Sequence, residues 1–123
     1  MTASGSFDVK LDPQKDETAP AGRMIINKQY SGGLAGEGVG QMLSKRTESG
    51  VAVYAAIEEF SGTVDGKKGA FTLIHNGYMT SESQTLKIEI IEGSGSGELK
   101  NISGELSITQ VDGTHNYELN YKL

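Results

Sequence analysis

The sequence has no cysteine, no tryptophan, and only 2 proline and 2 histidine residues among its 123 residues. Without cysteine, the chain has no disulfide, no thiolate zinc or iron–sulfur site and no cysteine nucleophile. The two histidines, His75 and His115, are 40 positions apart and form no metal-binding motif. We therefore expect neither a metal site nor a cofactor.

Positive charge and long apolar runs are also scarce. Lysine and arginine total 11 against 16 acidic residues, a net charge of -5, which argues against a nucleic-acid or anionic-membrane partner. The longest apolar run, residues 51–57, is far shorter than the roughly 20 residues that a membrane-spanning helix needs. The first six residues lack the basic and apolar regions of a signal peptide. The sequence therefore predicts a cytoplasmic protein.

Glycine is abundant, with 17 residues scattered among apolar ones, and alternation of apolar and polar residues recurs along nearly the whole chain. The length suits one domain, residues 1–123. About eight alternating segments, separated by turn signals at intervals of roughly 8–12 residues, predict an all-β domain, a single eight-stranded antiparallel β-barrel. They are residues 7–11, 24–30, 39–44, 51–60, 69–80, 85–91, 105–111 and 114–123.

The segments between these strands are predicted to be turns and loops. Residues 12–22 hold both prolines and several charges and indicate a loop. The glycine-rich residues 36–40 and 93–97 indicate turns, because no β-α-β context supports a phosphate-binding loop. Residues 41–46 also permit a helical turn. Gly32, Gly62 and Gly104 are predicted to bend strands.

The first Asp-Gly pair, Asp65-Gly66, marks a hairpin with two alternative registers. A Gly66-Lys67 loop places Glu58 opposite His75, whereas an Asp65-Gly66 loop places His75 diagonal to Glu58. Either register puts both side chains on the apolar face, because side chains alternate along a strand. The pair is then either a structural hydrogen bond that satisfies two buried groups, or a tuned pair for acid–base chemistry or ligand binding.

The second Asp-Gly pair predicts a hairpin that pairs Gln110 with His115 and Ile108 with Tyr117. His115 then lies at the barrel rim, while Tyr117 and Tyr121 point inward, as core side chains or as pocket lining. The candidate ligand-binding residues are those on the predicted inner face: Tyr54, Glu58, Phe71, His75, Tyr117 and Tyr121.

Several strings along the chain match a known pattern: residues 5–9, residues 54–58, Gly62-x-x-x-Gly66-x-x-Gly69-Ala70-Phe71 with His75, residues 93–99, residues 102–106 and residues 117–119. With these strings the chain resembles a bacterial family of small proteins of unknown function. That family is similar in fold to the allene oxide cyclase and dirigent barrels, which have eight antiparallel strands around a small lumen. The resemblance implies a barrel and no established activity, since function is not inherited from a fold.

These observations support three functional hypotheses. The first is a barrel that binds a small apolar molecule in its lumen, with Glu58 and His75 as polar anchor. The second is an isomerase- or cyclase-type enzyme in which the same two catalytic candidates act as acid and base. The third is a non-enzymatic protein that forms a homo-oligomer through an apolar outer face.

Overall fold

The computed structural model describes residues 1–123 and contains nine β-strands. It has no apolar helix of membrane-spanning length. The strands are β1 (Thr2–Gln14), β2 (Gly22–Gly32), β3 (Leu34–Arg46), β4 (Ala52–Val64), β5 (Lys67–Met79), β6 (Gln84–Ile90), β7 (Ser96–Gly97), β8 (Ser103–Val111) and β9 (Thr114–Lys122).

Eight of these strands close into an antiparallel barrel. The hydrogen-bonded order is β4-β3-β2-β1-β9-β8-β6-β5, and pairing of β5 with β4 closes the circle. The two-residue β7 pairs only with β5. Strand β1 pairs with β9 from Thr2↔Asn120 to Phe7↔His115, which joins the two ends of the chain in one sheet. The predicted all-β, eight-stranded barrel is confirmed.

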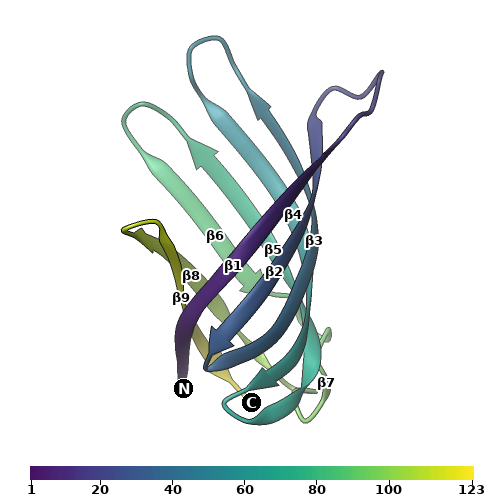
Figure 1. Ribbon diagram of the computed structural model, residues 1–123, viewed down its shortest axis with the longest axis vertical. Helices are drawn as coiled ribbons and strands as arrows, with labels where there is room; N and C mark the ends of the chain where they lie inside the picture. The colour runs from purple at the N-terminus through teal and green to yellow at the C-terminus, as the bar shows by residue number, and fades with distance from the viewer.

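The two ends of the barrel differ. At one end, which we call the mouth, the β1–β2, β3–β4 and β5–β6 hairpins project from the barrel, and both termini lie at the opposite end, the base (Figure 1). Residues 91–102, which connect β6 to β8, lie at the base and contribute the buried side chains of Leu99 and Ile102. The base is thereby closed by the chain's own side chains.

The hydrophobic core fills the base half of the barrel. Phe60, Phe71 and Leu34 are fully buried, and the Phe60 and Phe71 rings lie 5.0 Å apart. Towards the mouth, the side chains on the same inner face are only half-buried. These half-buried inner residues are Val9, Met24, Ile26, Met42, Tyr54, Met79 and Ile108.

Both Asp-Gly pairs form the predicted two-residue turns, with positive φ at each of the four residues. The first hairpin uses the Asp65-Gly66 register, so Glu58 lies opposite Leu73 and His75 lies opposite Ala56. The predicted pairs of the last hairpin, including Gln110 with His115, are also present. The Gly66-Lys67 alternative for the first hairpin is thereby excluded, and the last hairpin has the register that its turn predicted.

The prediction of a turn at residues 36–40 was wrong, as was the alternative of a helical turn at residues 41–46. Both segments lie in β3. Gly36, Gly38 and Gly40 face inward and alternate with outward-facing residues. The two-residue repeat of a strand is therefore present, but the inner face has no side chains at these positions. The predicted loop at residues 12–22 is shorter, because β1 continues to Gln14.

Glycine is required at one contact between β3 and β4. Gly36 and Gly62 are direct partners, with φ of 153° and 155°. A Cβ on Gly62 would collide with the backbone carbonyl of Ala35, and one on Gly36 with that of Ser61. The predicted bend at Gly62 thus coincides with a contact between two bare backbones.

Gly62→Ala should lower the free energy of unfolding by at least about 2 kcal/mol, because backbone strain and overpacking act together. Gly50→Ala is the matched control, since Gly50 has a φ of 92° but nothing within 4 Å of a Cβ. It should lose only about 1 kcal/mol. Urea unfolding of both variants measures the difference. Equal losses would show that the contact with β3 is unimportant.

Candidate functional site

The predicted pair of Glu58 and His75 exists inside the barrel. Glu58 Oε1 lies 2.8 Å from His75 Nε2, across the diagonal of the β4–β5 ladder. Only 2% of Glu58 and 6% of His75 is exposed to solvent. The carboxylate and the imidazole therefore form a buried hydrogen bond, as both sequence interpretations require.

Two further groups, which sequence analysis missed, complete a buried cluster around the same carboxylate. Lys28 and Tyr30 both come from the inner face of β2. Lys28 Nζ lies 3.0 Å from Glu58 Oε1, and the Tyr30 hydroxyl donates to Glu58 Oε2 at 2.5 Å. We call Lys28, Tyr30, Glu58 and His75 the carboxylate cluster. The sequence does indicate an inward position for Lys28, because Lys28 alternates in phase with the apolar Met24 and Ile26.

The cluster keeps Glu58 ionised. Burial alone raises the pKa of this carboxyl, but the hydrogen bond from His75, the charge of Lys28 and the hydrogen bond from Tyr30 outweigh burial and lower it to about 2. Burial and the adjacent Glu58 charge raise the pKa of Tyr30, so this hydroxyl keeps its proton. Glu58 is consequently a hydrogen-bond acceptor at neutral pH, with Lys28 as its counter-charge.

Space for the cluster comes from a missing side chain on the intervening strand. A Cβ on Gly38 of β3 would collide with Glu58 Oε2 and would lie within 2.9 Å of the Tyr30 ring. Since β3 separates β2 from β4, Gly38 lets side chains from both strands meet above it. Lys28 Nζ also lies 4.7 Å from the centre of the Phe7 ring, a cation–π contact from β1.

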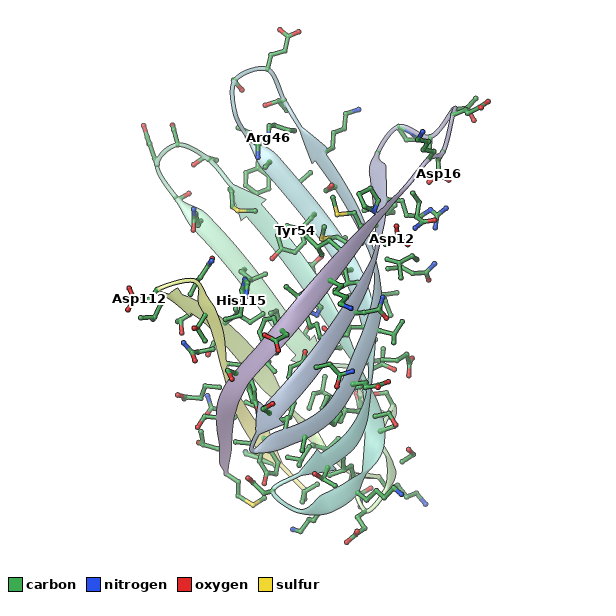
Figure 2. The ribbon with its side chains drawn as sticks, viewed as in Figure 1. Asp12, Asp16, Arg46, Tyr54, Asp112 and His115 are labelled. Atoms are coloured by element: carbon green, nitrogen blue, oxygen red, sulfur yellow. The ribbon has the colours of Figure 1, made fainter.

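A cavity of about 320 Å³ lies at the mouth, lined by Met42, Ser44, Lys45, Arg46, Ala52, Val53, Tyr54 and Met79. Most of these side chains belong to the inner face of β3, β4 and β5. Met42, Ala56 and His75 are consecutive cross-strand partners in one row of the sheet. Met42 therefore belongs both to the cavity wall and to the row that carries His75. Figure 2 shows Tyr54 and Arg46 towards the mouth end of the barrel.

The other candidate residues lie away from this cavity. Phe71 is fully buried against Phe60 in the base half. The Tyr117 hydroxyl accepts from the Leu34 amide at 2.7 Å and donates to the Ser31 carbonyl at 2.8 Å, which ties β9 to the β2–β3 turn. Of the six candidate residues, only Tyr54 lines this cavity. Glu58 and His75 are buried on the same inner face without lining the cavity, and Phe71 and Tyr117 belong to the hydrophobic core.

Tyr121 and the second histidine also have structural surroundings. The Tyr121 hydroxyl donates to Asp65 at 2.6 Å, and this bond raises the Tyr121 pKa to about 12. His115 is half-buried and stacks on Phe7 at 5.2 Å. No group of three or more His, Cys, Asp or Glu side chains is arranged to hold a metal ion.

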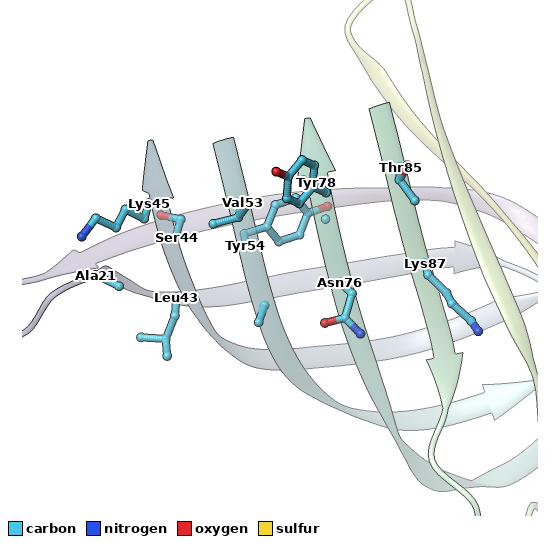
Figure 3. A pocket seen from close by; sticks show the side chains of 12 residues that line it. Ala21, Leu43, Ser44, Lys45, Val53, Tyr54, Asn76, Tyr78, Thr85 and Lys87 are labelled. Carbon is cyan, nitrogen blue, oxygen red and sulfur yellow. The ribbon is translucent and has the colours of Figure 1, made fainter. Parts of the chain in front are cut away.

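A second cavity, of about 580 Å³, lies on the outside of the barrel over β3, β4, β5 and β6 (Figure 3). Leu43, Val53 and Tyr78 line it, with Lys45 and Lys87 at its margin. The outward-facing side chains of Leu43 and Tyr78 are 51% and 56% exposed. One sector of the outer surface is therefore apolar, and it is separate from the carboxylate cluster.

Comparison with known proteins gives a consistent result. Residues 3–121 match the family model described as "Protein of unknown function (DUF3224)". A crystal structure of a protein of unknown function from the DUF3224 family of Shewanella oneidensis MR-1 is 36% identical, with a TM-score of 0.93. The similarity covers 100% of this chain and 97% of that one. No curated protein matches the chain. The predicted resemblance to a bacterial family of unknown function is confirmed.

Glu58→Gln should lower the free energy of unfolding at pH 7 by about 3–5 kcal/mol, because it leaves Lys28 buried without its counter-charge. The Glu58 pKa falls from an ordinary 4.5 to about 2 on folding, so its stabilisation is complete above pH 4.5 and is lost as the pH falls towards 2. The difference in free energy of unfolding between wild type and variant, measured by urea unfolding, should therefore become smaller from pH 4.5 to pH 2.

The exposed neighbour provides the control for this experiment. Glu59→Gln, on the outer face of β4, should change stability by less than about 0.5 kcal/mol. The double variant Lys28→Met/Glu58→Gln should be more stable than Glu58→Gln alone, since it removes both charges. A gap between wild type and Glu58→Gln that stays constant from pH 4.5 to 2 would contradict the ionised carboxylate.

Proposed function

The chain belongs to the DUF3224 family, and we propose that its barrel binds a small, largely apolar molecule at the mouth, above the carboxylate cluster. The supporting observation is the contrast between the two halves of the inner face. The base half is fully packed, whereas apolar side chains of the mouth half stay partly exposed and border a cavity of about 320 Å³. Small-molecule sites are typically concave and mostly apolar, with few polar groups.

Methionines support this proposal. Three of the four, Met24, Met42 and Met79, lie on the inner face of the mouth half, and Met24 is the direct cross-strand partner of Met42. The flexible, polarisable thioether adapts to ligands of different shape, so methionine is favoured at binding surfaces that tolerate several partners. The inner wall can accordingly adapt to apolar ligands of several shapes, and specificity comes from the polar end of the site.

The carboxylate cluster supplies that polar end. Both oxygens of Glu58 already accept hydrogen bonds within the protein, from Lys28, His75 and Tyr30. Glu58 is therefore unsuited to act directly on a ligand, and His75 is the group that remains to contact it. If the protein is instead an acid–base enzyme, His75 is the remaining candidate for the catalytic base. We place the binding in the cytoplasm, as the sequence predicts.

Ligand binding is tested with protein labelled with ¹³C at the methionine methyl groups, using 1-octanol as an apolar probe. The methyl signals of Met24, Met42 and Met79 should shift on titration. Met1, which is 63% exposed and lies at the base end, is an internal control and should not shift. Native mass spectrometry of protein taken directly from cells should show a retained small molecule.

Two matched variants on one strand locate the site. Ala52 lines the cavity at the mouth, whereas Ala55 faces outward on the same strand. Ala52→Phe should fill the cavity and weaken octanol binding at least about tenfold, while Ala55→Phe should leave it unchanged. Absence of any shift at the three inner methionines, or equal effects of the two variants, would refute binding at the mouth.

The apolar outer sector favours a second candidate, association with a second copy of this chain. The outer cavity of about 580 Å³ shares Leu43 and Ala55 with a neighbouring one of about 350 Å³. Ile57 and Tyr78 project from the same sector and are 55% and 56% exposed. In a two-fold interface, the same sector of each copy would supply both the hollows and the side chains that enter them.

Sedimentation velocity over a range of protein concentrations tests this association. The wild type should form a dimer as concentration rises, and Ile57→Glu should remain monomeric because it places a charge in the apolar sector. Thr109→Glu, on the polar outer face of β8, should dimerise like the wild type. A wild type that stays monomeric at every concentration would exclude the dimer.

A further inference from the structure

The carboxylate cluster has one polar atom that the protein itself does not use. Glu58 Oε1 accepts from Lys28 and His75, and Glu58 Oε2 accepts from Tyr30. An ionised carboxylate has no proton to donate. Every contact to Glu58 must therefore be made by a donor, and this requirement places a proton on the His75 nitrogen that faces Glu58.

His75 must carry a proton on Nε2. This nitrogen lies 2.8 Å from Glu58 Oε1, and the bond requires a donor at that position. A neutral imidazole has one N–H and one bare nitrogen, so protonation at Nε2 leaves Nδ1 as an acceptor. Glu58 thus acts as a positioning residue, because it selects the tautomer and the orientation of the ring.

The protons of the neighbouring groups are already engaged. The Lys28 ammonium faces Glu58 at 3.0 Å, the Tyr30 hydroxyl at 3.5 Å and the Phe7 ring at 4.7 Å. The Tyr30 hydroxyl proton is directed to Glu58 Oε2. Among the polar side-chain atoms of the cluster, Nδ1 of His75 is the one that makes no hydrogen bond to the others.

This nitrogen is also not completely covered by the rest of the protein. No buried side-chain nitrogen or oxygen in the protein lacks a hydrogen-bond partner. The hydrogen bond of the His75 ring is made by Nε2, so Nδ1 cannot be fully enclosed. His75 lies on the inner face, in the row that it shares with Met42 of the mouth cavity. Because the His75 side chain points into the barrel, the uncovered surface of Nδ1 faces the lumen.

We propose that Nδ1 of His75 is the polar recognition point of the lumen and accepts a hydrogen bond, so that the ligand is an apolar molecule bearing an O–H or N–H donor. This inference rests on the proposed function and specifies the ligand's chemistry. An apolar alcohol, phenol or amine fits this description, whereas an ether or ester of the same size offers no donor. Tyr54 also lines the cavity, and its hydroxyl is a second polar group of the wall.

Two isomeric probes test the inference: 1-octanol, which has a hydroxyl donor, and 1-methoxyheptane, which has none. Binding of each is followed at the labelled methionine methyls. The alcohol should bind roughly 3- to 10-fold more tightly, the difference that one hydrogen bond provides. His75→Phe should abolish this preference and leave the affinity for the ether nearly unchanged.

A measurement on the wild type keeps the test valid if His75→Phe does not fold. The ¹⁵N shifts of the His75 ring at pH 8 should show a protonated Nε2 and a bare Nδ1, and octanol alone should shift the Nδ1 signal. In Glu58→Gln, the side-chain amide can donate to Nε2, so the Nδ1–H tautomer should appear. Glu59→Gln should leave the tautomer unchanged, which distinguishes positioning by Glu58 from a general loss of charge.

The outcomes separate this inference from the proposed function. If neither probe shifts the inner methionines, the mouth does not bind apolar molecules and both proposals fail. If both probes bind with equal affinity and Nδ1 does not respond, binding at the mouth stands and the recognition role of His75 is overturned. A free protein in which Nδ1 is protonated at pH 8 would overturn it as well.

Discussion

An ionised carboxylate enclosed by apolar side chains is the constraint that organises the inner face of this barrel. Removing an isolated charge from water costs several kcal/mol, so Glu58 is tolerable only with donors already in place. Those donors come from both directions around the barrel: Lys28 and Tyr30 from β2, and His75 from β5. The strand between β2 and β4 must then leave room for them, which explains the bare inner face of β3 at Gly38.

The barrel has two different halves because the large buried side chains and the closing segment lie at one end. Residues 91–102 close the base, and the aromatic core above them is packed without exposed side chains, which supplies most of the hydrophobic stabilisation. The mouth half has no equivalent segment, so its apolar side chains remain partly exposed. The base half thus stabilises the barrel, the mouth half has the partly exposed apolar side chains, and the carboxylate cluster lies between the two halves. A site placed at this boundary has a rigid support on one side and open space on the other.

Local chemistry makes much of this arrangement predictable. The two Asp-Gly turns define their hairpins, and strict alternation is enough to predict that Glu58 and His75 share one face. Lys28 and Tyr30 follow the same alternation but were not recognised, because a lysine suggests a surface position unless its phase is compared with its neighbours. Gly38 was assigned to a turn because a cluster of glycines suggests one. These glycines occupy every second position, however, and this spacing is that of a strand. The β1–β9 and β6–β8 pairings join distant segments, and no local signal specifies them.

The β1–β9 pairing has a consequence for how the protein is made. Strand β1 lies between β2 and β9 in the sheet, so during synthesis it gains its second neighbour only when β9 has left the ribosome. Until then, a growing sheet exposes the edge of β1, and unpaired edges are templates for association with other chains. A topology dominated by distant contacts also folds slowly once synthesis is complete. Release of the β8–β9 hairpin is therefore the step that seals the barrel, and truncation or delay there exposes nascent chains to aggregation.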